Sequence, residues 1–315
     1  MARILITGAT GFIGTALSLY LQQQGHELRG AVRRPVPQGI PYEAVPVGNL
    51  HAGTPWSGAL EGIEIVIHLA ARIQPPDHAE NDPLEAFRRV NVEATAALAR
   101  QAAEAGVQRF IHLSTVKVHG ETNPPDQMIR EEAPLAPADA YAVSKAEAEA
   151  VLHTIAQETG LETVILRPPL VYGPGVGGNL ARLMQWIQRG LPLPLGAVTE
   201  NRRSLVALDN LVHLIALCVD HPAAAHQTFL VADAQALSTA DLLRVMGKAV
   251  GRPARLLPVP VPILRTAAAL LGQTDKARRL LDSLQVDTSK VRHMLGWRPQ
   301  LALEDGLRQM DTRRL

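Results

Sequence analysis

The chain has 315 residues, with 31 lysines and arginines against 30 aspartates and glutamates and one cysteine. A net charge of +1 and few aromatic side chains argue against a nucleic-acid partner, which needs a basic stripe or stacking aromatics. The lone Cys218 excludes an intramolecular disulfide and a cysteine-based metal cluster, so we expect no metal site. The 47% of hydrophobic residues is enough for a sizeable core and excludes a disordered chain.

The N-terminal residues do not resemble a targeting segment, because their apolar run is short and glycines soon interrupt it. The most apolar stretch, residues 259–271, is broken by two prolines and an arginine. It is shorter than the ~20 apolar residues that a membrane-spanning helix requires. We therefore expect a cytoplasmic protein without a membrane span.

The first half of the chain alternates short apolar runs with amphipathic helical patterns. Strands are predicted at 3–7, 27–32, 64–69, 109–113 and 163–166, and helices at 13–24, 82–105 and 139–159. Such alternation is typical of βαβ units, whose right-handed crossovers build a doubly wound parallel sheet with helices on both faces. The predicted fold class is α/β.

Beyond Tyr172 the pattern changes to a glycine-rich turn at 173–178, followed by helices with proline-rich joints. We expect two domains, a nucleotide-binding domain at 1–172 and a smaller, mixed substrate lobe at 173–315. Some C-terminal segments are expected to rejoin the first domain.

A glycine-rich loop, Gly8-Ala-Thr-Gly-Phe-Ile-Gly14, directly follows the first strand and opens the first helix. Glycines there permit a tight turn and close approach of a pyrophosphate, which the helix N-terminus attracts. The loop therefore predicts a Rossmann-type dinucleotide site. Its expected contacts are Gly8, Thr10, Gly11, Phe12, Ile13 and Gly14.

The second strand ends at Arg33 and Arg34, where NAD enzymes usually place a carboxylate against the ribose 2′-hydroxyl. Adjacent guanidinium groups can instead hold a 2′-phosphate through paired hydrogen bonds. We expect NADP as the cofactor. NAD is the alternative, with both arginines simply solvated.

Tyr141 and Lys145 lie four residues apart and so share one face of a predicted helix. A free tyrosine has a pKa near ~10, and an ammonium within ~4–6 Å lowers it by about 1–3 units. This spacing predicts that Tyr141 transfers a proton and that Lys145 also reaches the cofactor. The alternative is an amphipathic helix with a surface lysine and a half-buried tyrosine.

Two hydroxyl groups, Ser114 and Thr115, follow the strand at 109–113. A hydroxyl there can donate to the reacting oxygen of a substrate and hold it beside the tyrosine. Both residues are candidate catalytic groups. His68, near the end of the strand at 64–69, is expected to be structural.

The Gly-x-x-Gly-x-x-Gly loop with Tyr-x-x-x-Lys resembles the extended short-chain dehydrogenase/reductase family, also called NAD-dependent epimerase/dehydratase. Aligned on that family's Ser/Thr before Val-Tyr-Gly, Thr115 takes the catalytic position and His119 replaces the usual tyrosine. The resemblance implies that Asn91 steadies the active-site helix through backbone hydrogen bonds. It also implies cofactor contacts from Asn49, Leu50, Leu69, Ala70, Ala71, Asn91, Tyr141, Lys145 and Pro168.

Residues 166–175, Leu-Arg-Pro-Pro-Leu-Val-Tyr-Gly-Pro-Gly, resemble the signature of nucleotide-sugar enzymes in this family. The resemblance implies a UDP-sugar substrate, whose diphosphate Asn179 and Arg202 would hold. Lys117 and His119 are expected in the substrate pocket. An ion pair between Arg202 and Asp209 is the structural alternative.

The two residues after Thr115 are Val116 and Lys117, whereas sugar-nucleotide 4,6-dehydratases carry Asp-Glu there, so a dehydratase is not expected. The resemblance favours an enzyme that moves hydride at C4 of a UDP-hexose or UDP-N-acetylhexosamine for surface-polysaccharide synthesis. Both a 4-epimerase and a 4-ketoreductase fit, and the two arginines favour the ketoreductase.

Two other functions share parts of this pattern. A hydroxysteroid- or dihydroflavonol-type reductase needs the same catalytic groups but no diphosphate site, and an NADP-sensing regulator needs only the fold. The family also commonly forms homodimers through the helices predicted at 82–105 and 139–159. Alternating small residues at Ala146, Ala148 and Ala150 are compatible with that pairing.

Overall fold

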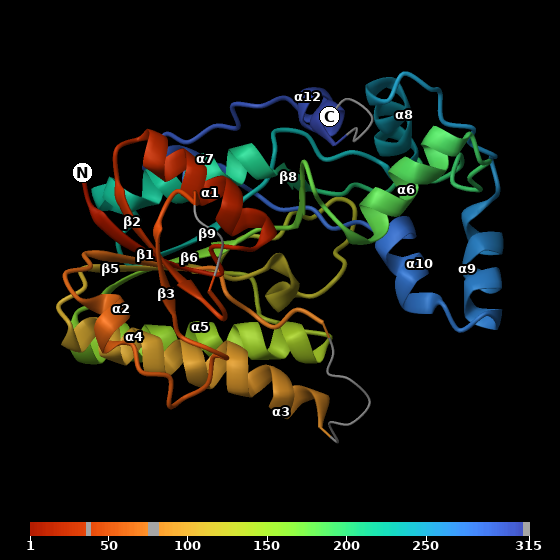
Figure 1. The fold of residues 1–315 in the computed structure, drawn as a ribbon. Helices are drawn as coiled ribbons and strands as arrows, with labels where there is room; N and C mark the ends of the chain where they lie inside the picture. Colours follow the sequence, from red (N-terminus) through yellow and green to blue (C-terminus); the bar gives the residue numbers. More distant parts are fainter. Residues whose placement is uncertain (36–38, 75–81, 311–315) are drawn as a thin grey trace.

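A computed structural model describes residues 1–35, 39–74 and 82–310. Within these ranges, seven parallel strands form one sheet in the order β3-β2-β1-β4-β5-β6-β9 (Figure 1). Their order changes direction between β1 and β4, as in a doubly wound sheet, and the predicted fold class is confirmed. The strands are β1 Arg3–Thr7, β2 Glu27–Val32, β3 Glu43–Pro46, β4 Ile65–His68, β5 Arg109–Leu113, β6 Glu162–Arg167 and β9 Gln227–Leu230.

Helices cover both faces of the sheet (Figure 1). Ile4 and Ile6 of β1 pack in one apolar cluster with α1 Phe12–Gln23 and α7 Leu208–Asp220, while Leu5 packs in the cluster on the opposite face. The central strands are apolar at nearly every position because both faces are covered. The opposite face carries α2 Ser57–Leu60, α3 Pro83–Arg88, α4 Ala94–Glu104 and α5 Ala140–Thr159.

A smaller lobe with its own apolar core lies beside the sheet (Figure 1). It contains α6 Gly178–Arg189, α8 Thr239–Ala249, α9 Val261–Leu270, α10 Thr274–Leu281 and α12 Leu303–Gln309. A two-stranded parallel pair, β7 Leu170–Tyr172 and β8 Leu205–Ala207, accompanies it. The sequence left open which later segments rejoin the first domain; in the structure they are α7, β9 and α11 Ser289–Leu295.

The structure adds elements that the sequence pattern did not indicate. Strands β3 and β9 have only four residues each, and β3 lies at a half-exposed edge, so neither gives a strong apolar run. The helix predicted at 82–105 is divided into α3, a π-helical turn at Arg89–Glu93 and α4. In the described part of the chain, no helix is long and apolar enough to cross a bilayer.

The turn between β1 and α1 yields a stability prediction. A Cβ atom at Gly14 would lie 2.8 Å from the Cα of Ala9, with the Gly8 carbonyl even closer, and backbone atoms there cannot move aside. We expect Gly14→Ala to lower the free energy of unfolding by about 1–3 kcal/mol, as overpacking does. Urea denaturation of both proteins measures this difference.

Gly58→Ala is the matched control, because Gly58 lies in α2 and a methyl group added there would have nothing within 4 Å. Its stability is expected to stay equal to the wild type or to rise slightly, since alanine favours helix. Equal stability of Gly14→Ala and wild type would contradict the tight packing of the loop.

Candidate functional site

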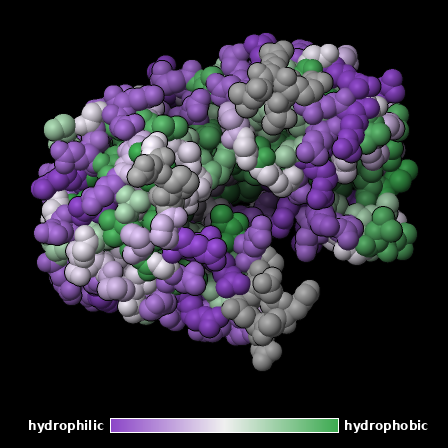
Figure 2. Space-filling view, in the orientation of Figure 1, coloured by the Kyte–Doolittle hydropathy of each residue, from purple (hydrophilic) through white to green (hydrophobic). Residues whose placement is uncertain are grey.

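A cavity of 1390 Å³ opens where β1, β2, β4 and β5 end. Ligands of open α/β sheets bind at these carboxyl ends, next to the point where the strand order reverses. Figure 2 shows the corresponding face hollowed near its middle, between the two lobes. The residues predicted from sequence that line it are Gly8, Thr10, Gly11, Phe12, Ile13, Gly14, Arg33, Arg34, Asn49, Leu50, Leu69, Ala70, Ala71, Ser114 and Tyr141.

The glycine loop has the geometry that a pyrophosphate requires. Gly8 has φ +71°, and a Cβ there would lie 2.9 Å from the Ala70 nitrogen. Helix α1 begins with no side-chain cap and no acidic residue in its first turn. The positive end of the helix therefore faces the cavity unopposed, and the residues present fit a dinucleotide.

The far end of the cavity is cationic. Arg33 and Arg34 follow β2, are exposed and line the cavity together with Asn49 and Leu50. Among the described residues that line the cavity there is no aspartate or glutamate. This end therefore offers positive charge to a ligand and no carboxylate to a ribose hydroxyl.

Tyr141 stands in the first turn of α5, where the Asp139 carboxylate caps the helix by accepting from the Ala142 N–H at 2.7 Å. Burial, and then the Asp139 carboxylate, raise the pKa of the Tyr141 phenol to about 12. The prediction that Lys145 lowers the pKa of this phenol is therefore wrong for the protein without a bound ligand. Burial and a neighbouring negative charge both favour the protonated phenol.

Lys145 does not line the cavity. Its side chain is buried, and its Nζ lies 2.9 Å from Nε2 of His112 on β5. Burial lowers the pKa of Lys145 to about 7, with the Glu149 carboxylate acting in the opposite direction. His112 is buried and its pKa is well below the usual range, so its neutral ring accepts this hydrogen bond.

His68 lies next to His112, with the two rings stacked 5.5 Å apart. Its nitrogens bond the hydroxyls of Thr7 at 2.7 Å and Thr95 at 2.9 Å. Burial, with Lys145 adding to it, lowers its pKa to about 3. His68 is thus a neutral, fully bonded histidine, as the structural interpretation of its sequence position predicted.

The two candidate hydroxyls have different partners. Ser114 lines the cavity and donates its proton to the buried Glu149 carboxylate. Thr115 caps the 3₁₀ turn η2 Val116–His119 by accepting from the Lys117 N–H at 3.3 Å, and it does not line the cavity. Toward a ligand, Ser114 can therefore only accept, whereas the Thr115 proton is still available for donation.

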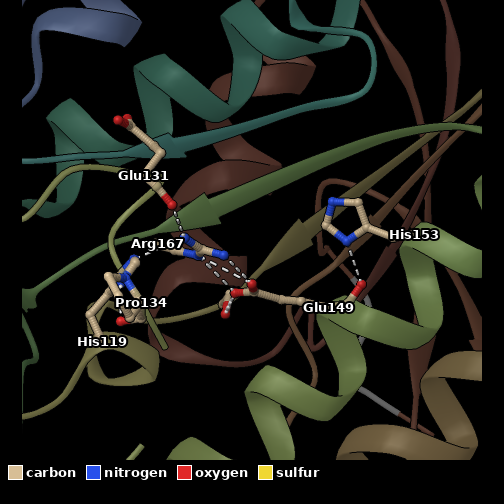
Figure 3. A network of polar contacts seen from close by, with 7 residues as sticks. His119, Glu131, Pro134, Glu149, His153 and Arg167 are labelled. Atoms are coloured by element: carbon tan, nitrogen blue, oxygen red, sulfur yellow. Dashed lines mark hydrogen bonds and ion pairs between the residues drawn. The ribbon is translucent and has the colours of Figure 1, made fainter. Parts of the chain in front are cut away.

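A buried polar network centred on Arg167 and Glu149 lies between β6 and α5 (Figure 3). Arg167 of β6 pairs with Glu149 of α5, with 2.5 Å between Nη2 and Oε2. The guanidinium also donates to the Glu131 carbonyl at 3.0 Å and to Nε2 of His119 at 2.8 Å. Neither Glu149 nor Arg167 was predicted as a site residue from the sequence, although Glu149 follows Lys145 by one helical turn and Arg167 lies in the 166–175 segment.

His119 was predicted as part of the substrate pocket. In the structure it is buried, and its Nδ1 faces the Pro134 carbonyl at 3.4 Å (Figure 3). Because a guanidinium can only donate, the proton of the neutral ring lies on Nδ1. Burial and then Arg167 lower the pKa of His119, which keeps the ring neutral. Both ring nitrogens already have partners, Nδ1 the Pro134 carbonyl and Nε2 the Arg167 guanidinium.

The remaining predicted residues lie outside the cavity lining. Asn91 accepts from the Arg72 N–H at 2.8 Å and donates to the Ser144 hydroxyl at 2.9 Å. It therefore ties the segment after β4 to α5, through a side chain of α5 instead of the backbone contacts expected. Pro168 is buried, and its carbonyl accepts from the Val116 N–H.

On the substrate side, Lys117 pairs with Glu121 and Asp139, each at 2.7 Å. Asn179 is exposed at the start of α6. Arg202 directs Nη1 to the backbone carbonyls of Thr199 and Asn201, at 2.7 and 2.9 Å. The Arg202 guanidinium is thus already engaged, and the alternative pairing with Asp209 is not formed.

Its neighbour Arg203 has different surroundings. The Arg203 guanidinium donates to the Asp282 carbonyl at 3.1 Å, and burial lowers its pKa. Arg279 lies close enough to affect it and pairs with Glu121 at 3.1 Å. No signal in the sequence separates Arg203 from Arg202, because the two adjacent arginines fit the same motif.

The burial of Lys145 makes stability depend on pH. Between pH ~7 and ~10.5 the unfolded chain carries a proton on this lysine that the folded chain lacks, so the stability of the wild type rises with pH. Lys145→Met removes this dependence. Because the variant has no buried ammonium, we expect its free energy of unfolding to exceed that of the wild type at pH ~7. This difference should shrink by on the order of 1 kcal/mol per pH unit up to pH ~10.5.

Urea denaturation at a series of pH values measures the effect, with the exposed Lys248→Met as control. The control is expected to follow the wild type at every pH. Parallel stability curves for Lys145→Met and wild type would show that Lys145 keeps an ordinary pKa.

Comparisons with known proteins agree with this geometry. The family described as "NAD dependent epimerase/dehydratase family" matches residues 4–232. A UDP-glucose 4-epimerase of Vibrio cholerae is 43% identical over 310 residues, which cover 97% of this chain and 93% of that protein. An Escherichia coli O157:H7 protein, N-acetyl-alpha-D-glucosaminyl-diphospho-ditrans,octacis-undecaprenol 4-epimerase, is 26% identical over 321 residues, 96% of this chain and 92% of that protein.

Among solved structures, MoeE5 in complex with UDP-glucuronic acid and NAD aligns with a TM-score of 0.77 and 25% identity, covering 99% of each chain. The UDP-glucuronic acid 4-epimerase of Bacillus cereus aligns with a TM-score of 0.78 at 21% identity over 98% of this chain and 97% of that one, which shows the shared fold. The family match and the Vibrio relative extend over most of the chain. The protein is a member of the NAD-dependent epimerase/dehydratase family.

Proposed function

We propose that this enzyme inverts the configuration at C4 of a UDP-sugar, with a nicotinamide dinucleotide in the large cavity. The observation that carries the proposal is the position of Tyr141, which lines a cavity built on the glycine loop. The 43% identity with a UDP-glucose 4-epimerase supports C4 of a UDP-sugar as the reacting position.

The glycine loop between β1 and α1 would hold the pyrophosphate of the cofactor, and Leu69, Ala70 and Ala71 would contact its nicotinamide half. A bound nicotinamide supplies the acceptor and donor of hydride at the sugar carbon. The chain itself has to bind the sugar and move one proton.

Tyr141 is the group that moves the proton. With a pKa of about 12 it is a neutral phenol at physiological pH, ready to donate to a carbonyl oxygen at C4. The opposite half-reaction, removal of the proton from the C4 hydroxyl, needs the phenolate. Positive charge near the ring lowers the pKa of a phenol and so favours that half-reaction.

The two hydroxyls would hold the C4 oxygen in complementary ways. Thr115 retains a proton that it can donate to a carbonyl oxygen. The Ser114 hydroxyl already donates its proton to the Glu149 carboxylate, so its oxygen can accept from a sugar hydroxyl. Together they would orient the reacting oxygen toward Tyr141 in both oxidation states of the sugar.

For the diphosphate we propose Arg203 and Arg279, with Asn179 at the start of α6, in place of Arg202. Arg279 is connected to the active-site helix through Glu121, Lys117 and Asp139, by contacts of 2.7 to 3.1 Å. This chain of ion pairs ends two residues before Tyr141. A diphosphate held by these arginines would therefore be tied to the helix that carries the phenol.

Removal of the phenol oxygen tests this mechanism. Tyr141→Phe is expected to lower kcat for interconversion of UDP-glucose and UDP-galactose by about 10²–10⁴-fold, because the general acid–base is lost. Product analysis by nuclear magnetic resonance measures the rate. Tyr20→Phe, on α1 outside the cavity lining, is the control and should retain wild-type turnover.

Turnover by Tyr141→Phe at the wild-type rate would refute the assignment of Tyr141. Calorimetry with UDP tests whether the substrate is a UDP-sugar, because only such an enzyme needs a site for the diphosphate. A protein that binds the dinucleotide but gives no heat with UDP would instead be a steroid-type reductase without a diphosphate site.

We further propose that the cofactor is NADP, because Arg33 and Arg34 are exposed in the cavity and no carboxylate lines it in the described residues. Arg33→Ala with Arg34→Ala is expected to weaken NADP binding by on the order of tenfold or more and to leave NAD binding unchanged. Fluorescence titration of both dinucleotides measures the constants. A wild type that binds NAD more tightly than NADP would contradict this preference.

The same two arginines favour a second candidate, a 4-ketoreductase that consumes NADPH. The two reactions differ in stoichiometry. An epimerase converts its sugar without net use of the dinucleotide, whereas a reductase oxidises one NADPH for each keto-sugar. We also propose a homodimer through the helices at 82–105 and 139–159. Of the small residues on the second helix, Ala150 is exposed, Ala146 is half-buried and Ala148 is buried within the protomer.

A further inference from the structure

The helices α9 and α10 form the outer end of the C-terminal lobe, far from the sheet (Figure 1). Helix α9 reads Val-Pro-Ile-Leu-Arg-Thr-Ala-Ala-Ala-Leu and has one charged side chain, yet none of its residues is buried. A helix this apolar normally buries its hydrophobic face in the protein. Here Val261, Leu264 and Ala268 are half-buried against the lobe, and the rest of the helix faces outward.

The outward face carries large apolar side chains. Ile263, Leu270 and Leu271 are 57%, 84% and 73% exposed, and Leu257 just before the helix is 49% exposed. Positions i, i+7 and i+8 lie on one side of a helix, so Ile263, Leu270 and Leu271 share one exposed face, which we call the apolar stripe. Figure 2 shows hydrophobic residues gathered at the edge of the molecule over α9.

The same region is strongly basic. We call residues 248–279 the tip; it has seven lysines and arginines against one aspartate, in a chain whose net charge is only +1. All seven cations are exposed. Arg265 and Arg279 pair with Asp282 and Glu121, whereas no ion pair is found within the described ranges for the other five, which are Lys248, Arg252, Arg255, Lys276 and Arg278. The tip therefore combines an open apolar stripe with uncompensated positive charge.

We propose that the tip docks on the surface of an anionic phospholipid bilayer, a property separate from the proposed reaction. Apolar side chains of an interfacial helix enter the acyl boundary, while lysines and arginines beside them remain at the anionic headgroups. A nucleic acid would match the charge but leave the leucines in water. A second copy of the chain would bring the five cations without an ion pair against the same five across a two-fold interface.

The test uses the full-length protein and sedimentation with lipid vesicles. The wild type is expected to pellet with vesicles of phosphatidylcholine and phosphatidylglycerol, less with phosphatidylcholine alone, and less again as salt is added. Leu270→Ser with Leu271→Ser is expected to weaken the partition coefficient on the order of tenfold or more. Lys276→Glu with Arg278→Glu should weaken binding to the anionic vesicles selectively.

Matched controls are Leu19→Ser on α1 and Arg292→Glu on α11, which are exposed elsewhere and should bind like the wild type. Sugar turnover should be unaffected in the tip variants, because the four substituted residues neither line the large cavity nor include Arg279, the one residue of the tip that belongs to the proposed diphosphate site. A wild type that stays in the supernatant with anionic vesicles would overturn the proposal. So would leucine variants that pellet like wild type, or a leucine-dependent oligomer that ignores lipid.

Discussion

The arrangement of the site depends on one buried ion pair, between Arg167 of β6 and Glu149 of α5. Both side chains are almost fully inaccessible, so each charge would be costly without the other. The pair joins β6 to the helix that carries Tyr141. Through further hydrogen bonds it also holds Ser114 after β5 and His119 at the end of the 3₁₀ turn. The loss of either partner would leave a buried charge unpaired, at about 3–5 kcal/mol.

The same helix carries a second buried cation whose surroundings are less favourable. Lys145 is one turn before Glu149, but its Nζ bonds a neutral histidine instead of a carboxylate. Burial therefore lowers its pKa toward neutrality, and Glu149 only partly opposes this. A lysine held in this way costs stability when it is charged, and proteins tolerate that cost mostly at functional sites.

Much of the fold could be predicted from the sequence because the sheet is parallel and covered on both faces. Strands β1 and β4 are short, mostly apolar runs, and the glycine loop after β1 indicates where the dinucleotide cavity lies. Strand β9 was missed because four residues of mixed character carry no period, and only the tertiary fold brings them beside β6.

The site was harder to predict than the fold. Spacing placed Tyr141 and Lys145 on one helix, and Tyr141 does line the cavity. It could not show that His112, on a strand 33 residues earlier, would take the ammonium, or that Asp139 would oppose an acidic phenol. A local sequence pattern does not indicate which residues of other helices and strands a side chain contacts. For this reason Arg202 could not be distinguished from Arg203.

The surroundings of Tyr141 favour one half of an epimerisation over the other. Burial and Asp139 keep Tyr141 protonated, which suits donation to a keto-sugar but not the removal of a proton from a hydroxyl. An epimerase must run both halves in turn. The proposed epimerase would therefore need additional positive charge near the phenol for the first half, and the cationic character of an oxidised nicotinamide is of the required sign. In this arrangement the phenol would become a base only when the oxidised cofactor is in place, so that proton and hydride leave the sugar together.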